Sequence, residues 1–260
     1  MARIFITGST TGLGLIAARQ LLGRGHEVIL HARNGARARD LEAALGFRPF
    51  VAVGDLGSIR ETLGVAQQVA GFGAVDSVIH NAGVGYGGDR AVTDDGYPDI
   101  FAVNVLAPYL LTASVPGPNR LVYLSSGMHR VTPDFADLLW RKRRWNGALA
   151  YSESKFLVTA LALAVARLQV VTYSNAVDPG WVPTRMGGRN APDDLDEGAV
   201  TQVCLAEGAP ADLASLTGRY LHHLRATEPH PQAKNQVLQD QLLRFCAELT
   251  GVTLGADSAG

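Results

Sequence analysis

The chain has 260 residues, which fits one large domain or two small ones. Hydrophobic residues make up 47% of it and charged residues 18%, a balance that allows a sizeable core and excludes a disordered protein. The formal net charge of −1 excludes the basic surplus typical of proteins that bind nucleic acid or anionic membranes.

Cysteine usage and hydropathy predict a soluble cytoplasmic protein. Cys204 and Cys246 are far apart and have no metal-ligand spacing, so we expect reduced thiols and no metal site. The apolar run before the first glycines is too short for a signal peptide. The most apolar later stretch contains Arg167 and is too short for a membrane span, so none is expected.

Apolar runs of strand length alternate with amphipathic stretches along the whole chain. Strands are expected at RIFIT (3–7), EVILHA (27–32), PFVAVG (49–54), AVDSVIHNA (74–82), NRLVYLSS (119–126) and VVTYSNAV (170–177). Helices are expected over 13–23, 36–45, 59–70, 99–113 and 152–168. We therefore predict a single Rossmann-type α/β domain over residues 1–260, a doubly wound parallel sheet with helices on both faces.

Three long segments interrupt this alternation, at 84–97, 127–150 and 181–197. Each follows an expected strand at its carboxyl end, where open α/β sheets bind ligands, so we interpret them as substrate loops. Their large apolar residues are Tyr86, Met128, Phe135, Trp140, Trp145, Trp181 and Met186. Of these we select Met128, Trp140, Trp181 and Met186 as substrate-binding residues suited to a bulky ketone or aldehyde. The alternative is that they pack on their own scaffold.

A glycine-rich turn links the first expected strand to the first expected helix. In ITGSTTGLG the glycines have the spacing G-x-x-x-G-x-G. Glycines allow close backbone approach, and a helix N-terminus presents free N–H groups to a pyrophosphate. The residues expected to bind a dinucleotide here are Gly8, Ser9, Thr10, Thr11, Gly12, Leu13 and Gly14. The alternative is an ordinary glycine turn.

Arg33 follows the second expected strand, where an NAD site often has an acidic residue for the ribose 2′-hydroxyl. A guanidinium can instead pair with a 2′-phosphate in forked geometry, so we expect NADP(H) in preference to NAD(H). The alternative is a solvated basic start of a helix. Further cofactor contacts are expected where the third and fourth strands end, at Asp55, Leu56, Asn81, Ala82 and Gly83.

Tyr151 and Lys155 in AYSESK are the candidate catalytic pair. Because they lie at positions i and i+4, their side chains share one face of a helix. The ordinary pKa of a tyrosine is about 10, and a neighbouring ammonium favours the phenolate. We therefore expect Lys155 to lower the pKa of Tyr151, so that the phenol can exchange a proton near neutral pH.

The ordered set of motifs resembles the short-chain dehydrogenase/reductase family. The matching motifs run over residues 3–184 and are Thr7-Gly8-x-x-x-Gly12-x-Gly14, Asp55, Asn81-Ala82-Gly83, Asn104, Ser125-Ser126, Tyr151-x-x-x-Lys155 and Pro179-Gly180. The later chain is most similar to the retinol-dehydrogenase-like and protochlorophyllide-reductase-like branch, and also to bacterial ketoreductases that tailor polyketides. The chain departs from the family at His80, where asparagine is usual, and in the wide separation of Ser126 from Tyr151.

The resemblance implies a role for each matched residue. Tyr151 is then the general acid in carbonyl reduction, and Ser126 hydrogen-bonds the substrate oxygen. Lys155 holds the nicotinamide ribose, and Asn104 holds a water that connects Lys155 to solvent. The implied cofactor contacts also include Tyr151, Pro179, Gly180, Val182 and Thr184. In the alternative reading the serines cap a loop, Asn104 is a polar group inside a helix, and Pro-Gly is only a turn.

Together these features predict an NADPH-dependent short-chain oxidoreductase, a ketoreductase or alcohol dehydrogenase, acting on a bulky, apolar, polyketide-like carbonyl compound. A nucleotide-sugar epimerase or dehydratase also uses Tyr-x-x-x-Lys, but usually has a larger C-terminal substrate domain than this chain. A non-catalytic NADP(H)-sensing module commonly lacks the tyrosine or the lysine. By the resemblance, helices 99–113 and 152–168 are expected to form a homo-oligomer face. The run RKRRW (141–145) is either a solvated face or a contact for an anionic substrate.

Overall fold

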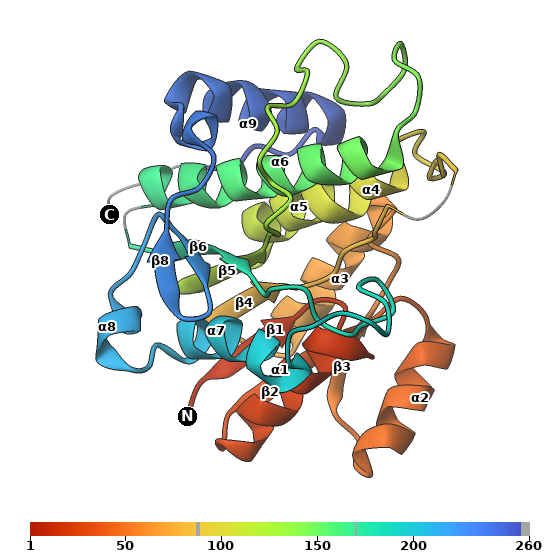
Figure 1. Cartoon of the computed structure of the whole chain (residues 1–260). Helices are drawn as coiled ribbons and strands as arrows, with labels where there is room; N and C mark the ends of the chain where they lie inside the picture. Colours follow the sequence, from red (N-terminus) through yellow and green to blue (C-terminus); the bar gives the residue numbers. More distant parts are fainter. Residues whose placement is uncertain (87–88, 170, 256–260) are drawn as a thin grey trace.

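Eight strands form one sheet within the residues that the computed structural model describes, 1–86, 89–169 and 171–255 (Figure 1). Their order is β3-β2-β1-β4-β5-β6-β7-β8, and all neighbours are parallel except the antiparallel pair β7–β8. The strands are β1 (Arg3–Ile6), β2 (Glu27–Ala32), β3 (Phe50–Val53), β4 (Ser77–His80), β5 (Arg120–Leu124), β6 (Tyr173–Asp178), β7 (Arg219–His222) and β8 (Arg225–Thr227). The strand order reverses between β1 and β4, which is where a doubly wound sheet binds its ligand.

Helices cover both faces of this sheet because alternate strand residues point to opposite sides. Phe5 and Ile29 pack with α3, α5, α6 and α9, whereas Ile4, Ile6 and Leu30 pack with α1 and α7 (Figure 1). The helices are α1 (Gly12–Gly23), α2 (Gly35–Leu45), α3 (Ile59–Gly71), α4 (Asp99–Phe101), the π-helix η1 (Ala102–Leu106), α5 (Ala107–Ser114), α6 (Gly147–Leu168), α7 (Leu195–Glu207), α8 (Ala211–Ala214), the 3₁₀-helix η2 (Pro231–Lys234) and α9 (Gln236–Thr250). The predicted α/β domain with a doubly wound sheet is confirmed.

The six expected strands are all present, although residues 87–88 of loop 84–97, residue 170 of the expected strand 170–177 and residues 256–260 lie outside the described residues. The start of the helix expected over 152–168 is wrong. Helix α6 begins five residues earlier, where the Asn146 side chain caps it by accepting a hydrogen bond from the Leu149 N–H at 3.1 Å. Tyr151 therefore lies inside the second turn of a rigid helix.

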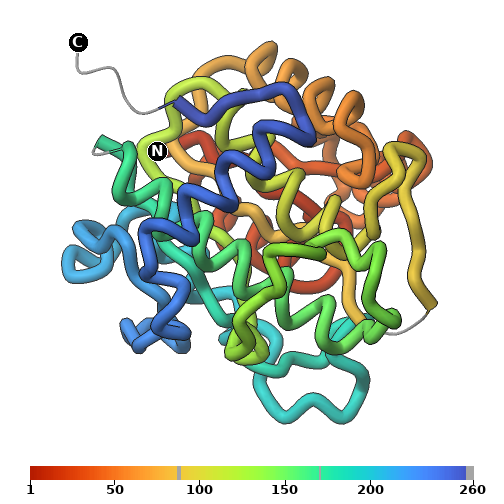
Figure 2. The backbone as a smooth tube through the Cα atoms, turned by 90° about the horizontal axis from the view of Figure 1, so that it is seen from above, coloured from red at the N-terminus to blue at the C-terminus, as the bar shows by residue number. Residues whose placement is uncertain are grey.

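The C-terminal elements were not predicted from the sequence, and they change which surfaces are available. Helix α9 lies over α6, as Figure 2 shows with α9 in blue above the green α6. Residues 150–165 of α6 are all buried, and the Tyr109 hydroxyl of α5 donates to the Val252 carbonyl at 2.7 Å. The expected oligomer face on helices 99–113 and 152–168 is thus wrong, because the chain's own C-terminus covers it.

Helix α6 is also apolar and long enough to span a membrane by length and composition alone. However, 89% of its apolar window is buried inside the protein. We therefore identify α6 as the central core helix of the domain, which carries Tyr151 and Lys155 between the sheet and α9.

Candidate active site

The glycine turn after β1 has the open backbone that a pyrophosphate needs. Gly8 and Gly12 have φ values of +63° and +59°, in the left-handed region that favours glycine. A Cβ atom on Gly8 would lie 2.8 Å from the Cα atom of Ala82. In the part of the chain described by the structure, Thr11 makes no side-chain cap at the start of α1. The first amides of α1 are therefore directed at the site of an anion.

Two polar side chains hold this turn against its neighbours. Asn81 Nδ2 donates to the carbonyl oxygens of Thr7 and Gly8 at 2.9 and 3.2 Å. The Ser9 hydroxyl is buried and committed to the turn, since it donates to the Ile6 carbonyl at 3.0 Å. Ser9 can therefore contribute its backbone to a cofactor, whereas its hydroxyl has a structural role.

His31 supports the same turn and was missed by the sequence analysis. Its Nδ1 accepts from the Gly8 N–H at 3.0 Å, so Nε2 carries the proton and donates to the Gly54 carbonyl at 2.9 Å. Burial, its largest cause, lowers the pKa of His31 and keeps the ring neutral. A histidine inside an apolar strand is the sequence signal for such a buried role. Its partners, Gly8 and Gly54, follow β1 and β3, so the sequence around His31 does not reveal them.

Arg33 and Asp55 lie together at the carboxyl ends of β2 and β3. The guanidinium of Arg33 is 73% exposed and forms an ion pair with Asp55 Oδ2 at 2.7 Å. Leu56 is buried in the core, so only its backbone faces this end of the site. The structure thus brings one exposed guanidinium to the place where the 2′-position of an adenosine ribose was expected.

The predicted catalytic residues converge at the carboxyl ends of β4 and β5. The Ser126 hydroxyl lies near enough to the phenol of Tyr151 to lower its pKa, and it accepts from the Met128 N–H at 3.2 Å. Ser125, by contrast, is 3% exposed and its hydroxyl donates to the Lys155 carbonyl at 3.2 Å. The geometry therefore favours Ser126 over Ser125 as the hydroxyl that meets a substrate oxygen.

The expected lowering of the pKa of Tyr151 is wrong. Burial raises the pKa of Tyr151 to about 12, and the nearby Ser126 hydroxyl opposes this rise only in part. Lys155 is itself buried, and its ammonium, 5.6 Å from the Tyr151 ring centre, donates to the Leu124 carbonyl at 2.8 Å. Desolvation of the phenol therefore dominates, and Tyr151 is protonated at neutral pH.

Burial likewise lowers the pKa of Lys155 to about 8, and the carboxylate of Asp178 opposes this effect. Asn104, in the π-helix η1, accepts from the Val84 N–H at 2.9 Å and donates to the Ser154 hydroxyl at 3.0 Å. A Cβ atom on Gly83 would lie 3.3 Å from Asn104 Oδ1 and 3.5 Å from Lys155 Nζ. A side chain at position 83 would therefore occupy the space next to Asn104 Oδ1 and Lys155 Nζ, which glycine leaves open.

His80, which departs from the family pattern, lies in the core away from this chemistry. Its Nε2 is hydrogen-bonded to the Thr112 hydroxyl at 3.2 Å, and its ring stacks on Tyr123 with a centroid distance of 4.6 Å. Burial lowers its pKa to about 3, so the imidazole is neutral. Its effect is confined to packing between β4, β5 and α5.

The segment after β6 returns to the glycine turn. Gly180 adopts a φ of +84°, and Val182 is buried. The methyl group of Thr184 would lie 3.6 Å from a Cβ atom on Gly12. The segment from Pro179 to Thr184 therefore lies next to the start of α1. The residues expected to contact the carboxamide and the phosphates thus lie close to the glycine turn.

The three loops carry exposed apolar side chains, and two of these loops meet beside Tyr151. The rings of Tyr86 and Tyr151 are 5.3 Å apart, and the Met186 side chain packs over Gly85. Met128, Trp181, Met186 and Tyr86 are all at least one-third exposed. Loops 84–97 and 181–197 thus meet beside the phenol, and their exposed apolar groups are available to a ligand.

Trp140 is placed differently from these residues. Its side chain is 6% exposed, packs with Ile100, Ala150 and Tyr151, and donates from Nε1 to Glu153 at 3.0 Å. It therefore supports Tyr151 from behind, and we do not keep it as a substrate-binding residue. A bulky loop residue and a core residue look alike in sequence, since both are large and apolar.

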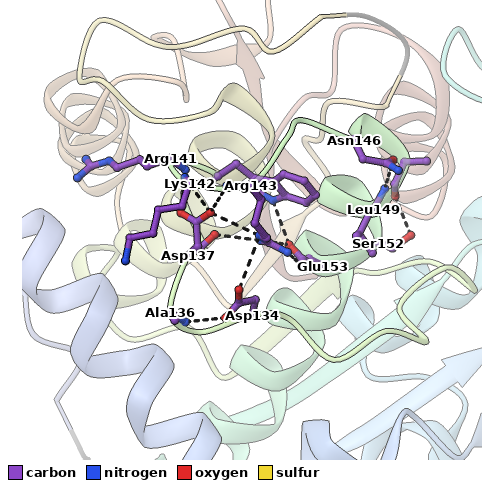
Figure 3. A network of polar contacts seen from close by, with 12 residues as sticks. Asp134, Ala136, Asp137, Arg141, Lys142, Arg143, Asn146, Leu149, Ser152 and Glu153 are labelled. Carbon is purple, nitrogen blue, oxygen red and sulfur yellow. Dashed lines mark hydrogen bonds and ion pairs between the residues drawn. The ribbon is translucent and has the colours of Figure 1, made fainter.

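Arg143 anchors loop 127–150 to α6 and explains the basic run (Figure 3). Its Nη1 and Nη2 atoms donate to the two carboxylate oxygens of Glu153 at 2.8 and 3.0 Å, and its guanidinium lies 3.9 Å above the Trp140 ring. Asp137 accepts from the backbone N–H groups that follow it, including that of Arg143 at 2.9 Å. The run is neither a uniform solvated face nor a free anion site at this position.

Replacing Arg143 by methionine is expected to lower the free energy of unfolding by about 2 kcal/mol, because it leaves the buried Glu153 carboxylate unpaired. Urea unfolding monitored by circular dichroism measures the loss. The double variant Arg143→Met/Glu153→Gln should recover most of the stability, and Arg144→Met, at an exposed position of the same run, should leave it unchanged. Equal losses in the single and double variants would show that the unpaired charge is not the cause.

This arrangement fits a nicotinamide dinucleotide. A Cβ atom on Gly14 would lie 2.5 Å from Asn81 Nδ2, so this position of the turn has no room for a side chain. Free amides at the start of α1, the exposed guanidinium of Arg33 and the ammonium of Lys155 all lie at the carboxyl ends of the strands, where they can meet the phosphates and riboses of a dinucleotide. When bound, the nicotinamide supplies a hydride.

The chain's own residues then protonate the oxygen of the reacting carbonyl and hydrogen-bond to it. Tyr151 holds a proton at Oη and can donate it to that oxygen as negative charge develops. The Ser126 hydroxyl, which lies beside the phenol, can donate its one hydrogen bond to the same carbonyl oxygen. The buried side chains of Lys155 and Asn104 lie close to each other beside Gly83.

Known proteins share these features over the whole chain. The family model described as short chain dehydrogenase matches residues 2–118. The short-chain dehydrogenase chyC of Penicillium rubens is 41% identical over 98% of this chain and 100% of its own length. Retinol dehydrogenase 13 of Homo sapiens is 28% identical over 96% of this chain and 84% of its own. A crystal structure of an uncharacterized protein from Mycobacterium paratuberculosis, 25% identical, superposes with a TM-score of 0.80 over 98% and 95% of the two chains.

Sequence, fold and site therefore agree on an oxidoreductase that acts on CH–OH or C=O groups with a nicotinamide cofactor. The resemblance drawn from the ordered motifs is confirmed by relatives that cover nearly the whole chain. The protein belongs to the short-chain dehydrogenase/reductase family, in its retinol-dehydrogenase-like branch.

Proposed function

We propose that the protein is an NADPH-dependent ketoreductase that reduces a bulky, apolar ketone or aldehyde of the aromatic polyketide type in the cytoplasm. The observation that carries this proposal is the meeting of Tyr151 with Ser126 and Lys155, beside exposed apolar side chains of loops 84–97 and 181–197. The proton is on the enzyme, as reduction requires. The apolar border favours a large substrate with little charge. Free, buried Cys204 and Cys246 are consistent with a reducing compartment.

The preference for NADPH rests on Arg33. Its guanidinium is 73% exposed and planar, and its pairing with Asp55 leaves donors that can meet a 2′-phosphate in forked geometry. Asp55 is neutralised by the same pair, which reduces the repulsion that a free carboxylate would exert on that phosphate.

Replacing Arg33 by alanine is expected to weaken NADPH binding about tenfold or more and to leave NADH binding nearly unchanged, because one charge-assisted contact is lost. Isothermal titration of both dinucleotides measures the two dissociation constants. Arg60→Ala removes a comparably exposed guanidinium away from the site and serves as the matched control. Equal weakening for NADPH and NADH would contradict a contact with the 2′-phosphate.

The reaction is tested by NADPH consumption with a panel of ketones and aldehydes that includes aromatic polyketides, with NADH in parallel. Turnover of bulky apolar carbonyls by NADPH supports the proposal. NADPH binding without turnover across the panel would favour a non-catalytic sensing module. The epimerase alternative has less support, because α7, β7 and α9, which follow Thr184, pack against the same sheet and helices.

A further inference from the structure

Asp178, the last residue of β6, holds a carboxylate at the active-site edge of the sheet that the mechanism above does not use. Its Oδ1 accepts from the Gly180 N–H at 3.0 Å, and its side chain is 13% exposed. A Cβ atom on Gly127, the residue after Ser126, would lie 3.2 Å from Asp178 Oδ2. The carboxylate is therefore fixed between the Ser126 loop and the Pro179-Gly180 turn.

A strained hairpin tip holds the other side of this carboxylate. His222 lies opposite Asp178 in the β6–β7 register, and its Nδ1 is 3.4 Å from Asp178 Oδ2. The next residues, His223 and Leu224, have φ values of +45° and +65°, which is costly for side-chain-bearing residues. The ring of His223 packs edge-on against His222 with a centroid distance of 4.0 Å. The tip thus keeps the His222 ring against Asp178.

The negative charge of Asp178 acts on both proton-bearing groups of the site. Lys155 donates to the Leu124 carbonyl, and Leu124 pairs with Val177, the residue before Asp178. Among the charged groups of the described residues, Asp178 is the one that favours the charged form of Lys155. It also disfavours the phenolate of Tyr151 and so raises the pKa of that phenol.

The other titratable groups around Asp178 lie on the loop that follows Ser126 and on the β7 side of the sheet. The phenol of Tyr220 has a raised pKa, chiefly because it is buried and also because the Asp178 carboxylate is near. His129 is fully buried, and desolvation lowers its pKa. Arg130, an exposed group on the same loop, is close enough to act on Tyr220 and His129. His222 and His223, on the β7 side, complete the set.

We propose that Asp178 is a positioning residue whose fixed negative charge holds the protons on Tyr151 and Lys155, and so prepares the site to donate a proton to a carbonyl oxygen. This inference rests on the proposed function, because it favours carbonyl reduction over alcohol oxidation at neutral pH. No new bond is formed by Asp178 itself. It acts through the two groups that hold the protons.

Lysine NMR tests this role without any turnover. The chain contains three lysines, Lys142, Lys155 and Lys234, so protein labelled with ¹³C at lysine Cε gives few signals, and Lys155→Met identifies that of Lys155. We expect the Lys155 signal to titrate with a midpoint near pH 8 in the wild type. Asp178→Asn, which keeps an oxygen acceptor for the Gly180 N–H, should move the midpoint to lower pH by about one pH unit.

Asp193→Asn is the matched control. Asp193 accepts from the Trp181 N–H at 2.6 Å beside the same turn, but its charge does not act measurably on Lys155. In Asp193→Asn the titration midpoint of the Lys155 signal should equal that of the wild type. If Asp178→Asn fails to fold, Asp178→Ser removes the same charge and should show the same fall. An unmoved Lys155 midpoint in a folded neutral variant would overturn the role of Asp178.

The pH profile of turnover gives a second readout. In Asp178→Asn the alkaline fall of kcat for carbonyl reduction and the alkaline rise of kcat for alcohol oxidation should both move to lower pH. Profiles identical to those of the wild type in an active variant would contradict the proposal. If the wild type consumes no NADPH with any carbonyl, the proposed function fails, while the NMR midpoint still tests Asp178 by itself.

Discussion

Tyr151→Phe is expected to lower kcat for carbonyl reduction about 10²- to 10⁴-fold while leaving the dissociation constant for NADPH within about twofold. The variant removes the hydroxyl that donates the proton and that lies beside Ser126. It keeps the ring that packs against Tyr86 and with Ile100, Trp140 and Ala150. The loss should therefore lie in the chemical step and not in the fold or in cofactor binding.

Steady-state NADPH oxidation measures kcat, and isothermal titration measures NADPH affinity. Tyr173→Phe is the matched control, because this half-exposed tyrosine begins β6 at the opposite end of the strand from Asp178. It should keep wild-type turnover. Unchanged kcat in Tyr151→Phe would rule out Tyr151 as the general acid, and equal losses in both variants would point to a general effect of removing a phenol.

Gly14→Ala is expected to lower the free energy of unfolding by about 3 kcal/mol and to abolish measurable dinucleotide binding. The new methyl group would lie 2.5 Å from Asn81 Nδ2, 2.6 Å from the Gly8 carbonyl oxygen and 3.0 Å from Ser9 Cα. These neighbours are backbone atoms and a side chain that itself hydrogen-bonds the turn, so they cannot move without opening it.

Urea unfolding and dinucleotide titration measure the two effects of Gly14→Ala. Gly64→Ala, inside α3, is the control, since nothing lies within 4 Å of its added methyl group. The control should gain about 0.5–1 kcal/mol, as alanine does over glycine within a helix. Wild-type stability and binding in Gly14→Ala would show that the turn is looser than its contacts indicate.

Local periodicity predicted the part of the fold that contains the cofactor end of the site. Strands such as RIFIT and EVILHA are short, apolar and separated by helical stretches, so their type and order follow from the chain alone. The extra strands β7 (RYLH) and β8 (RAT) escaped detection because they have fewer apolar residues than the predicted strands RIFI and FVAV. They become strands by pairing, β7 with β6 and β8 with β7.

Trp140 and the expected oligomer face were misread for a related reason. A tryptophan in a long loop can point toward a ligand or toward the core, and only its contacts with Ile100 and Glu153 decide which. Helix α6 is apolar on nearly every side, which suits either a subunit interface or a buried core helix. The docking of α9 decides between them.

By itself the sequence determined the doubly wound sheet, the glycine turn and the identity and order of Asn104, Ser126, Tyr151 and Lys155, because each depends on residues close together in the chain. Only the tertiary structure decided the state of the protons. The pKa of Tyr151 is raised and not lowered, since burial outweighs the effect of the nearby Ser126 hydroxyl. The placement of Asp178 against His222 depends on β6 and β7, strands separated by forty residues of chain. Solvation and long-range charge are properties of the folded molecule, and no local pattern contains them.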